Sequence, residues 1–174
     1  MWVFAYGSLM ADGWEKVFGS MSRAVATLHD YERSFTKAST VNWGTKAHPA
    51  PTLRIVERAG AKCMGVAFEF LDDRQDGVFE YLAGREGRGF TRIGVRLTLT
   101  SGDAVEAFTY RYDGRSVITT SDVTALAEMA TLAKGTSGTG AEYIRQAQEA
   151  LAMEGLSDST IDAIAAAMTE TNST

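Results

Sequence analysis

The sequence predicts an α+β fold in which a small mixed β-barrel is surrounded by helices. Residues 90–100 alternate apolar and polar side chains, and the return segment 104–112 carries aromatic residues. A pair of strands with both faces covered suits a small closed barrel with helices packed around it. From Ser121 onward the pattern becomes helical, which supplies part of that cover.

Further short segments, bounded by turn residues, have the apolar or alternating character of strands. They are residues 2–6, 24–28, 33–37, 52–57 and 62–71. A turn at His29-Asp30 is expected between the second and third of them. A hairpin turn over residues 58–61, which include Gly60, is expected between the fourth and fifth.

Helices are predicted where capping residues precede apolar side chains at helical spacing. They cover residues 72–83, 121–134, 141–154 and 157–168, and residues 10–22 form a short helix or an ordered loop. Gly84 should end the first of these helices, which leaves residues 85–89 as a loop. No repeat or linker divides the sequence, so residues 1–174 are expected to form one domain with a frayed tail at 169–174.

The composition excludes several classes of function. The chain has 174 residues, 45% hydrophobic and 22% charged, with a net charge of −5, which argues against a nucleic-acid partner. No apolar run is long enough for a membrane span. The single cysteine, Cys63, is expected to be a packing residue and fits a reducing cytoplasm. Two histidines and one cysteine argue against a dedicated metal site.

The stretch Tyr6-Gly7-Ser8-Leu9 contains the point where the first predicted strand breaks. A glycine at the end of a buried strand usually marks a turn that a side chain would block. Such a turn leaves the N–H groups of Gly7, Ser8 and Leu9 without strand partners, and converging N–H groups bind a carboxylate or a developing oxyanion. An ordinary turn after a strand is the alternative interpretation.

Glu86 is the candidate catalytic carboxylate. It lies between Arg85 and Arg88, and the flanking glycines Gly87 and Gly89 allow another backbone to approach closely. A solvated loop glutamate paired with an arginine is the alternative from local sequence alone. The two arginines could hold a substrate carboxylate or be solvated, and solvation is favoured for Arg88.

Four segments together resemble a single family, in the same order along the chain. Their sequences are VFAYGSL from Val3, STVNWGT from Ser39 with Pro49 following, YLAGREGRGF from Tyr81, and SGTGAEYI from Ser137. The chain is similar to the γ-glutamylcyclotransferase superfamily, in particular its ChaC-like branch. This resemblance spans most of the chain and implies a γ-glutamylcyclotransferase-like barrel.

The resemblance also implies a reaction and roles for particular residues. The substrate is a γ-glutamyl compound, and its α-amino group attacks its own γ-carbonyl to release 5-oxoproline and an amine. Glu86 occupies the position of the family's catalytic glutamate, and the Gly7-Ser8-Leu9 turn suits the oxyanion. Tyr143 matches a family tyrosine expected to reach the site, with a core tyrosine as the alternative. Tyr6 either binds substrate or packs.

Three functions are compatible with this resemblance. The first is a glutathione-specific γ-glutamylcyclotransferase that needs no cofactor or metal. The second is the same chemistry on other γ-glutamyl amines or dipeptides, and the third is a non-catalytic module that binds γ-glutamyl metabolites. Retention of Glu86 in its motif argues against the third. The oligomeric state is unknown, and the loop at 39–51 is either functional or a surface crossover in which Trp43 covers the core edge.

Overall fold

The computed structural model describes residues 1–171 and contains a closed barrel with strand order β1-β3-β2-β4-β5. The strands are β1 (Trp2–Ala5), β2 (Ser22–Ser39), β3 (Ala50–Glu69), β4 (Phe90–Leu99) and β5 (Ala104–Tyr112). The helices are η1 (Ser8–Met10), α1 (Trp14–Val17), η2 (Asp72–Arg74), α2 (Gln75–Glu86), α3 (Val123–Leu132), α4 (Gly140–Ala152) and α5 (Ser159–Thr171). Strands β1 and β5 are parallel and the other recorded pairs are antiparallel, so the predicted mixed barrel is confirmed.

The chain divides into two compact units. Unit 1 contains residues 1–32 and 55–115, and unit 2 contains residues 33–54 and the chain from Ser116 onward. The long strands β2 and β3 contribute residues to both units. The organisation as one domain stays a prediction, and each unit is described by itself below.

Strands β2 and β3 are each continuous, so the turns predicted at His29-Asp30 and at residues 58–61 are wrong. Asp30 and Gly60 both have positive φ angles, of 60° and 78°. The Gly60 N–H donates to the Asp30 carboxylate across 2.7 Å. A single left-handed residue of this kind bends a strand, as at a β-bulge, without reversing it.

The hairpin of β4 and β5 follows the prediction closely. Its turn is closed by a 2.8 Å bond from the Leu99 N–H to the Asp103 carbonyl, and the register places Arg92 opposite Tyr110. The second face of the hairpin is covered by α2, because the Phe79 ring lies 4.9 Å from the Phe108 ring. The Arg92 guanidinium lies 3.7 Å from the centre of the Phe79 ring. Apolar cover on this face was predicted from the aromatic residues of β5.

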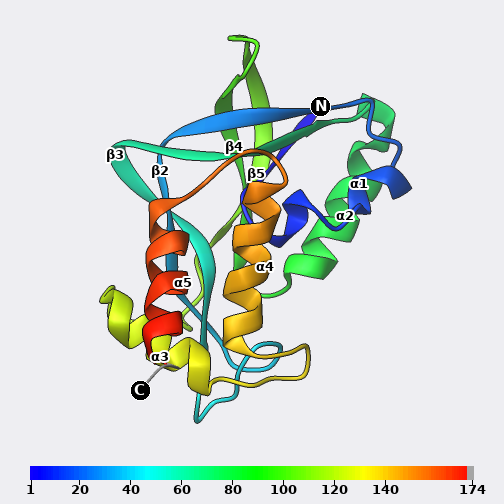
Figure 1. Cartoon of the computed structure of the whole chain (residues 1–174). Coiled ribbons are helices and arrows are strands. Elements are labelled where there is room, and N and C mark those ends of the chain that lie inside the picture. The colour runs from blue at the N-terminus through cyan, green and yellow to red at the C-terminus, as the bar shows by residue number, and fades with distance from the viewer. Residues whose placement is uncertain (172–174) are drawn as a thin grey trace. The chain divides into compact units, whose positions relative to one another are not determined.

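Helices α1 and α2 lie side by side in unit 1 (Figure 1). The buried Trp14 indole joins them, because its ring stacks on Tyr81 of α2 with centroids 6.1 Å apart. The same indole contacts Phe68 of β3 and the adjoining Phe70, at 5.7 Å and 5.5 Å. Trp14 therefore fixes the segment after β1 against both a helix and the barrel.

Unit 2 contains the three C-terminal helices, with α4 and α5 side by side (Figure 1). Helix α3 is capped by Asp122, whose carboxylate accepts from the Ala125 N–H at 2.8 Å, so it begins slightly later than the helix predicted from Ser121. Helix α4 begins with a capping box between Thr139 and Glu142. Helix α5 continues through Thr171, so the predicted frayed tail begins inside a helix, and residues 172–174 lie outside the described residues.

The loop between α3 and α4 is tightly packed on the loop after β2. The Ser137 N–H donates to the Asn42 carbonyl at 2.7 Å, and the Thr136 N–H donates to the Val41 carbonyl at 2.9 Å. A Cβ atom on Gly135 would lie 2.4 Å from the Asn42 backbone. Only a glycine therefore allows the two loops to approach this closely.

Gly135→Ala is expected to lower the free energy of unfolding by about 1–3 kcal/mol, because the added methyl group overpacks the loop contact. Gly84→Ala in α2 is the control, since a Cβ atom there meets nothing within 4 Å. It should raise the free energy of unfolding by roughly 0.5–1 kcal/mol, as expected for a helix interior. Urea unfolding curves measure both values, and a Gly135→Ala protein as stable as the wild type would contradict the packing argument.

Candidate functional site

The turn after β1 contains two backbone N–H groups that have no partner within η1. The first hydrogen bond of η1 runs from the Met10 N–H to the Gly7 carbonyl at 2.9 Å, so the N–H groups of Ser8 and Leu9 precede the first intrahelical bond. Ser8 is exposed and Leu9 is buried. The Trp14 indole N–H donates to the Leu9 carbonyl at 3.0 Å, which holds the turn in place.

Tyr6, the last residue before the turn, is buried. Its hydroxyl donates to the backbone carbonyl of Tyr110 across 2.8 Å, which joins the end of β1 to β5. This bond favours the packing alternative for the Tyr6 O–H group. The phenol oxygen keeps its capacity as an acceptor.

Glu86 is the last residue of α2, which corrects the prediction that it lies on a loop after a helix end at Gly84. The helix instead ends at Gly87, which has a φ of 73° and donates its N–H to the Ala83 carbonyl at 3.1 Å. Glu86 is half-buried. Because it belongs to a regular helix, its backbone position is set by the packing of α2 rather than by a loop.

Tyr110 of β5, which was not singled out as a site residue in the sequence, is affected by the charge of Glu86. Burial raises the pKa of the Tyr110 phenol, Arg92 opposes that rise, and the Glu86 charge adds to it. Glu86 therefore lies within electrostatic reach of the Tyr110 hydroxyl, which also donates to the Phe79 carbonyl at 3.3 Å. Pairing of the two predicted strands across their turn could have placed Arg92 opposite Tyr110, but nothing in the sequence relates Tyr110 to Glu86.

Arg85, the neighbour of Glu86, binds other protein groups. Its guanidinium forms an ion pair with the Asp12 carboxylate and donates to the Tyr81 hydroxyl at 3.3 Å. Burial lowers the pKa of the guanidinium, but the hydrogen bonds and charges of Asp12 and Tyr81 together outweigh it, and the net shift is upward. These contacts hold Arg85 within the protein, whereas the sequence left it either to bind a substrate carboxylate or to be solvated.

Tyr143 belongs to unit 2, whereas the other six predicted site residues belong to unit 1. The Tyr143 hydroxyl accepts from the Leu53 N–H at 3.1 Å. Its ring lies 5.3 Å from Trp43 of the loop after β2 and 6.4 Å from Phe35. Within unit 2, Tyr143 therefore connects α4 to that loop and to β3.

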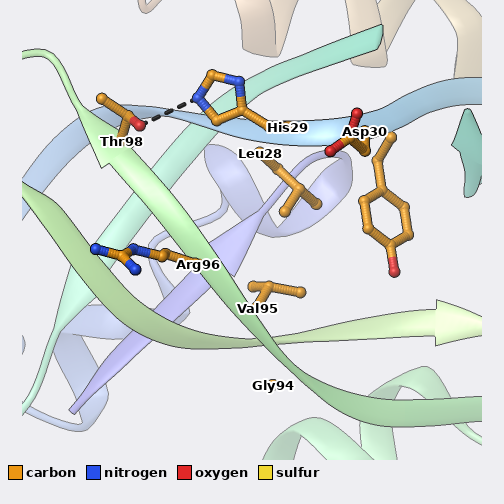
Figure 2. A pocket seen from close by; sticks show the side chains of 8 residues that line it. Leu28, His29, Asp30, Gly94, Val95, Arg96 and Thr98 are labelled. Atoms are coloured by element: carbon orange, nitrogen blue, oxygen red, sulfur yellow. Dashed lines mark hydrogen bonds between the residues drawn. The ribbon is translucent and has the colours of Figure 1, made fainter. Parts of the chain in front are cut away.

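A hollow of about 430 Å³ lies between β2 and β4 and contains none of the predicted site residues. Figure 2 shows Leu28 and Val95 between the two strands, with the His29 ring turned toward Thr98. The His29 Nε2 atom and the Thr98 hydroxyl oxygen are 3.1 Å apart. The hollow is partly open to solvent, and the residues that line it were not among those predicted to carry the chemistry.

Within residues 1–171, no three His, Cys, Asp or Glu side chains are grouped as metal ligands would be. No helix in the same range is both long and apolar enough to cross a membrane. Cys63 is fully buried, as predicted for a packing residue.

Comparison with known proteins gives consistent matches. Residues 1–171 match the family described as ChaC-like protein. The chain is 28% identical over 162 residues to a glutathione-specific γ-glutamylcyclotransferase of Escherichia coli K12, covering 91% of this chain and 68% of that protein. It is 27% identical over 176 residues to γ-glutamylcyclotransferase 2-3 of Arabidopsis thaliana, covering 95% and 86%.

The fold is also found among solved structures. A γ-glutamyl cyclotransferase specific to glutathione from yeast has a TM-score of 0.84 with this chain at 20% identity. That match covers 98% of this chain and 96% of the yeast chain, and it establishes a common fold. Together with the family match over residues 1–171, it leads to one conclusion: the chain belongs to the ChaC-like protein family.

Proposed function

We propose that this chain is a γ-glutamylcyclotransferase that cleaves glutathione to 5-oxoproline and Cys-Gly. Membership of the ChaC-like family and the names of its relatives support this activity. The observation that carries the proposal is the position of Glu86 at the end of α2. Its neighbour Arg85 binds Asp12, close after the Ser8–Met10 turn, so carboxylate and backbone donors belong to one connected part of unit 1.

The reaction is an intramolecular acyl transfer. The α-amino nitrogen of the γ-glutamyl group bonds to the γ-carbonyl carbon, and the bond from that carbon to the cysteinyl nitrogen then breaks. Because the nucleophile is tethered, much of the entropy cost of bringing the reactants together is already met. Glu86 accepts a proton from the α-ammonium group and delivers one to the departing nitrogen.

The backbone of the first turn has the complementary task. The N–H groups of Ser8 and Leu9 donate to the oxyanion that forms on the former γ-carbonyl oxygen. Glu86 also lies at the C-terminal end of α2, where the helix carries partial negative charge. Tyr143 and the phenol oxygen of Tyr6 are proposed substrate contacts. The proposed location of the protein is a reducing cytoplasm.

The test is a 5-oxoproline assay with glutathione and a panel of γ-glutamyl amines and dipeptides. We expect glutathione to be turned over fastest, with the same rate in the presence of a chelator. Faster turnover of another panel compound would assign the enzyme to the second substrate class. Binding of γ-glutamyl compounds without any 5-oxoproline would contradict the enzymatic function and support a binding module.

A further inference from the structure

We infer that the ion pair between Asp12 and Arg85 positions the backbone turn of residues 7–10 relative to Glu86. This inference rests on the proposed function, because it assigns Arg85 to the alignment of the two catalytic parts. Arg85 precedes Glu86 in α2, and Asp12 lies two residues beyond the end of η1. The pair is therefore a direct link between the two segments that must act on one substrate.

The link is part of a connected set of contacts on both sides. Asp12 accepts from the Trp14 N–H at 3.3 Å, and the Trp14 indole in turn donates to the Leu9 carbonyl. On the other side, Arg85 donates to the Tyr81 hydroxyl, and the Tyr81 ring stacks on Trp14. The contacts thus close a ring of interactions that begins at the Trp14 indole and ends at the Trp14 backbone N–H, so a shift of Arg85 is transmitted to Leu9.

The side chains of the pair are less exposed than those of a nearby surface ion pair. The Arg85 and Asp12 side chains are 27% and 35% exposed, and burial reduces the screening of their attraction by solvent. The pair of Arg74 with Asp73, just before α2, has side chains 61% and 72% exposed and 3.8 Å apart. Arg74 is thus a matched control of the same chemistry outside the ring of contacts.

The kinetic test compares Asp12→Asn, Arg85→Gln, the double variant and the control Arg74→Gln, with urea unfolding curves for each. Asp12→Asn keeps an acceptor for the Trp14 N–H and removes only the charge. Each single variant should lower kcat by about 10- to 100-fold with little change in KM, because misalignment of about 1 Å costs this much. The double variant should be no slower than the slower single variant, since both changes remove one contact. Arg74→Gln should match the wild type.

A second measurement needs no substrate. Amide hydrogen exchange of peptides covering residues 7–13 should be faster in Asp12→Asn and Arg85→Gln than in the wild type and in Arg74→Gln. Unchanged exchange would overturn the positioning role. If the two variants exchange faster but the wild-type protein makes no 5-oxoproline, the proposed function is wrong. The structural link between Asp12 and Arg85 would still stand.

Three outcomes would also overturn the inference. A raised KM with unchanged kcat in Arg85→Gln would assign this guanidinium to a substrate carboxylate instead. Additive losses in the double variant would show that Asp12 and Arg85 act separately. A loss of stability with unchanged kcat per folded molecule would reduce the pair to an ordinary structural contact.

Discussion

Glu86→Gln is expected to give a folded protein whose turnover of glutathione is lower by roughly 100-fold or more, because the amide cannot transfer the proton. The amide keeps the shape of the side chain and most of its hydrogen bonds. The side chain is half-buried at a helix end, so the free energy of unfolding should change by less than about 1 kcal/mol. The 5-oxoproline assay measures turnover, and a melting curve measures stability. A ligand titration measures binding of a γ-glutamyl compound to the variant.

Glu80→Gln is the matched control for this experiment. Glu80 is exposed and lies on the same helix, α2, so the same chemical change there should leave turnover unaltered. Near wild-type turnover in Glu86→Gln would exclude Glu86 as the catalytic residue. Global unfolding of Glu86→Gln, with Glu80→Gln still folded, would support a structural role for Glu86.

Ser8→Pro is expected to lower turnover by about 100- to 1,000-fold, the usual loss when one oxyanion donor is removed. Proline lacks the N–H group, and it fixes φ near the value that a first helical position requires. Ser8 is exposed and is the first residue of η1, so the substitution should preserve the fold. The 5-oxoproline assay and a melting curve on the purified variant measure both effects.

Ser8→Ala separates the backbone from the side chain. It removes the hydroxyl and keeps the N–H group, so its turnover should stay close to that of the wild type. Full turnover in a folded Ser8→Pro protein would remove the N–H donors from the mechanism. A large loss in Ser8→Ala would transfer the role to the hydroxyl.

The hairpin of β4 and β5 could be predicted in detail from sequence because local features determine it. The alternation of apolar residues identifies its faces, and the turn around Gly102 fixes the register. The position of Tyr110 opposite Arg92 follows from that register alone. The effect of the Glu86 charge on Tyr110 does not, because it depends on how α2 packs on the hairpin.

The wrong predictions share a physical cause. Gly60 and Gly84 were assigned to a turn and a helix end, because glycine is common in both. In β3, pairing with β2 and the Asp30 bond outweigh the local preference of Gly60 for a turn. In α2, burial of Phe79 and Leu82 outweighs a glycine cost of about 1 kcal/mol, and the helix continues to Glu86. Local propensity was overridden by tertiary packing in each case.

The role of Asp12 shows the other limit of sequence reasoning. Asp12 and Arg85 are far apart in the sequence, and neither belongs to a spacing pattern that indicates an ion pair. Only the stacking of α1 on α2 through Trp14 and Tyr81 brings them together. The resemblance predicts the roles of Glu86 and the first turn. The ion pair between their neighbours, Arg85 and Asp12, is found only in the three-dimensional structure.

The parallel pairing of β1 with β5 has a consequence for the order of folding. Trp2 lies beside Ala107 and Val3 beside Phe108, and the Thr109 hydroxyl donates to the Phe4 carbonyl at 2.9 Å in the core. A nascent chain cannot make these contacts until β5 has left the ribosome, and long-range pairing of this kind is slow. The Gly7-Ser8 turn, which continues directly from β1, is therefore shaped late, after most of unit 1 has been synthesised.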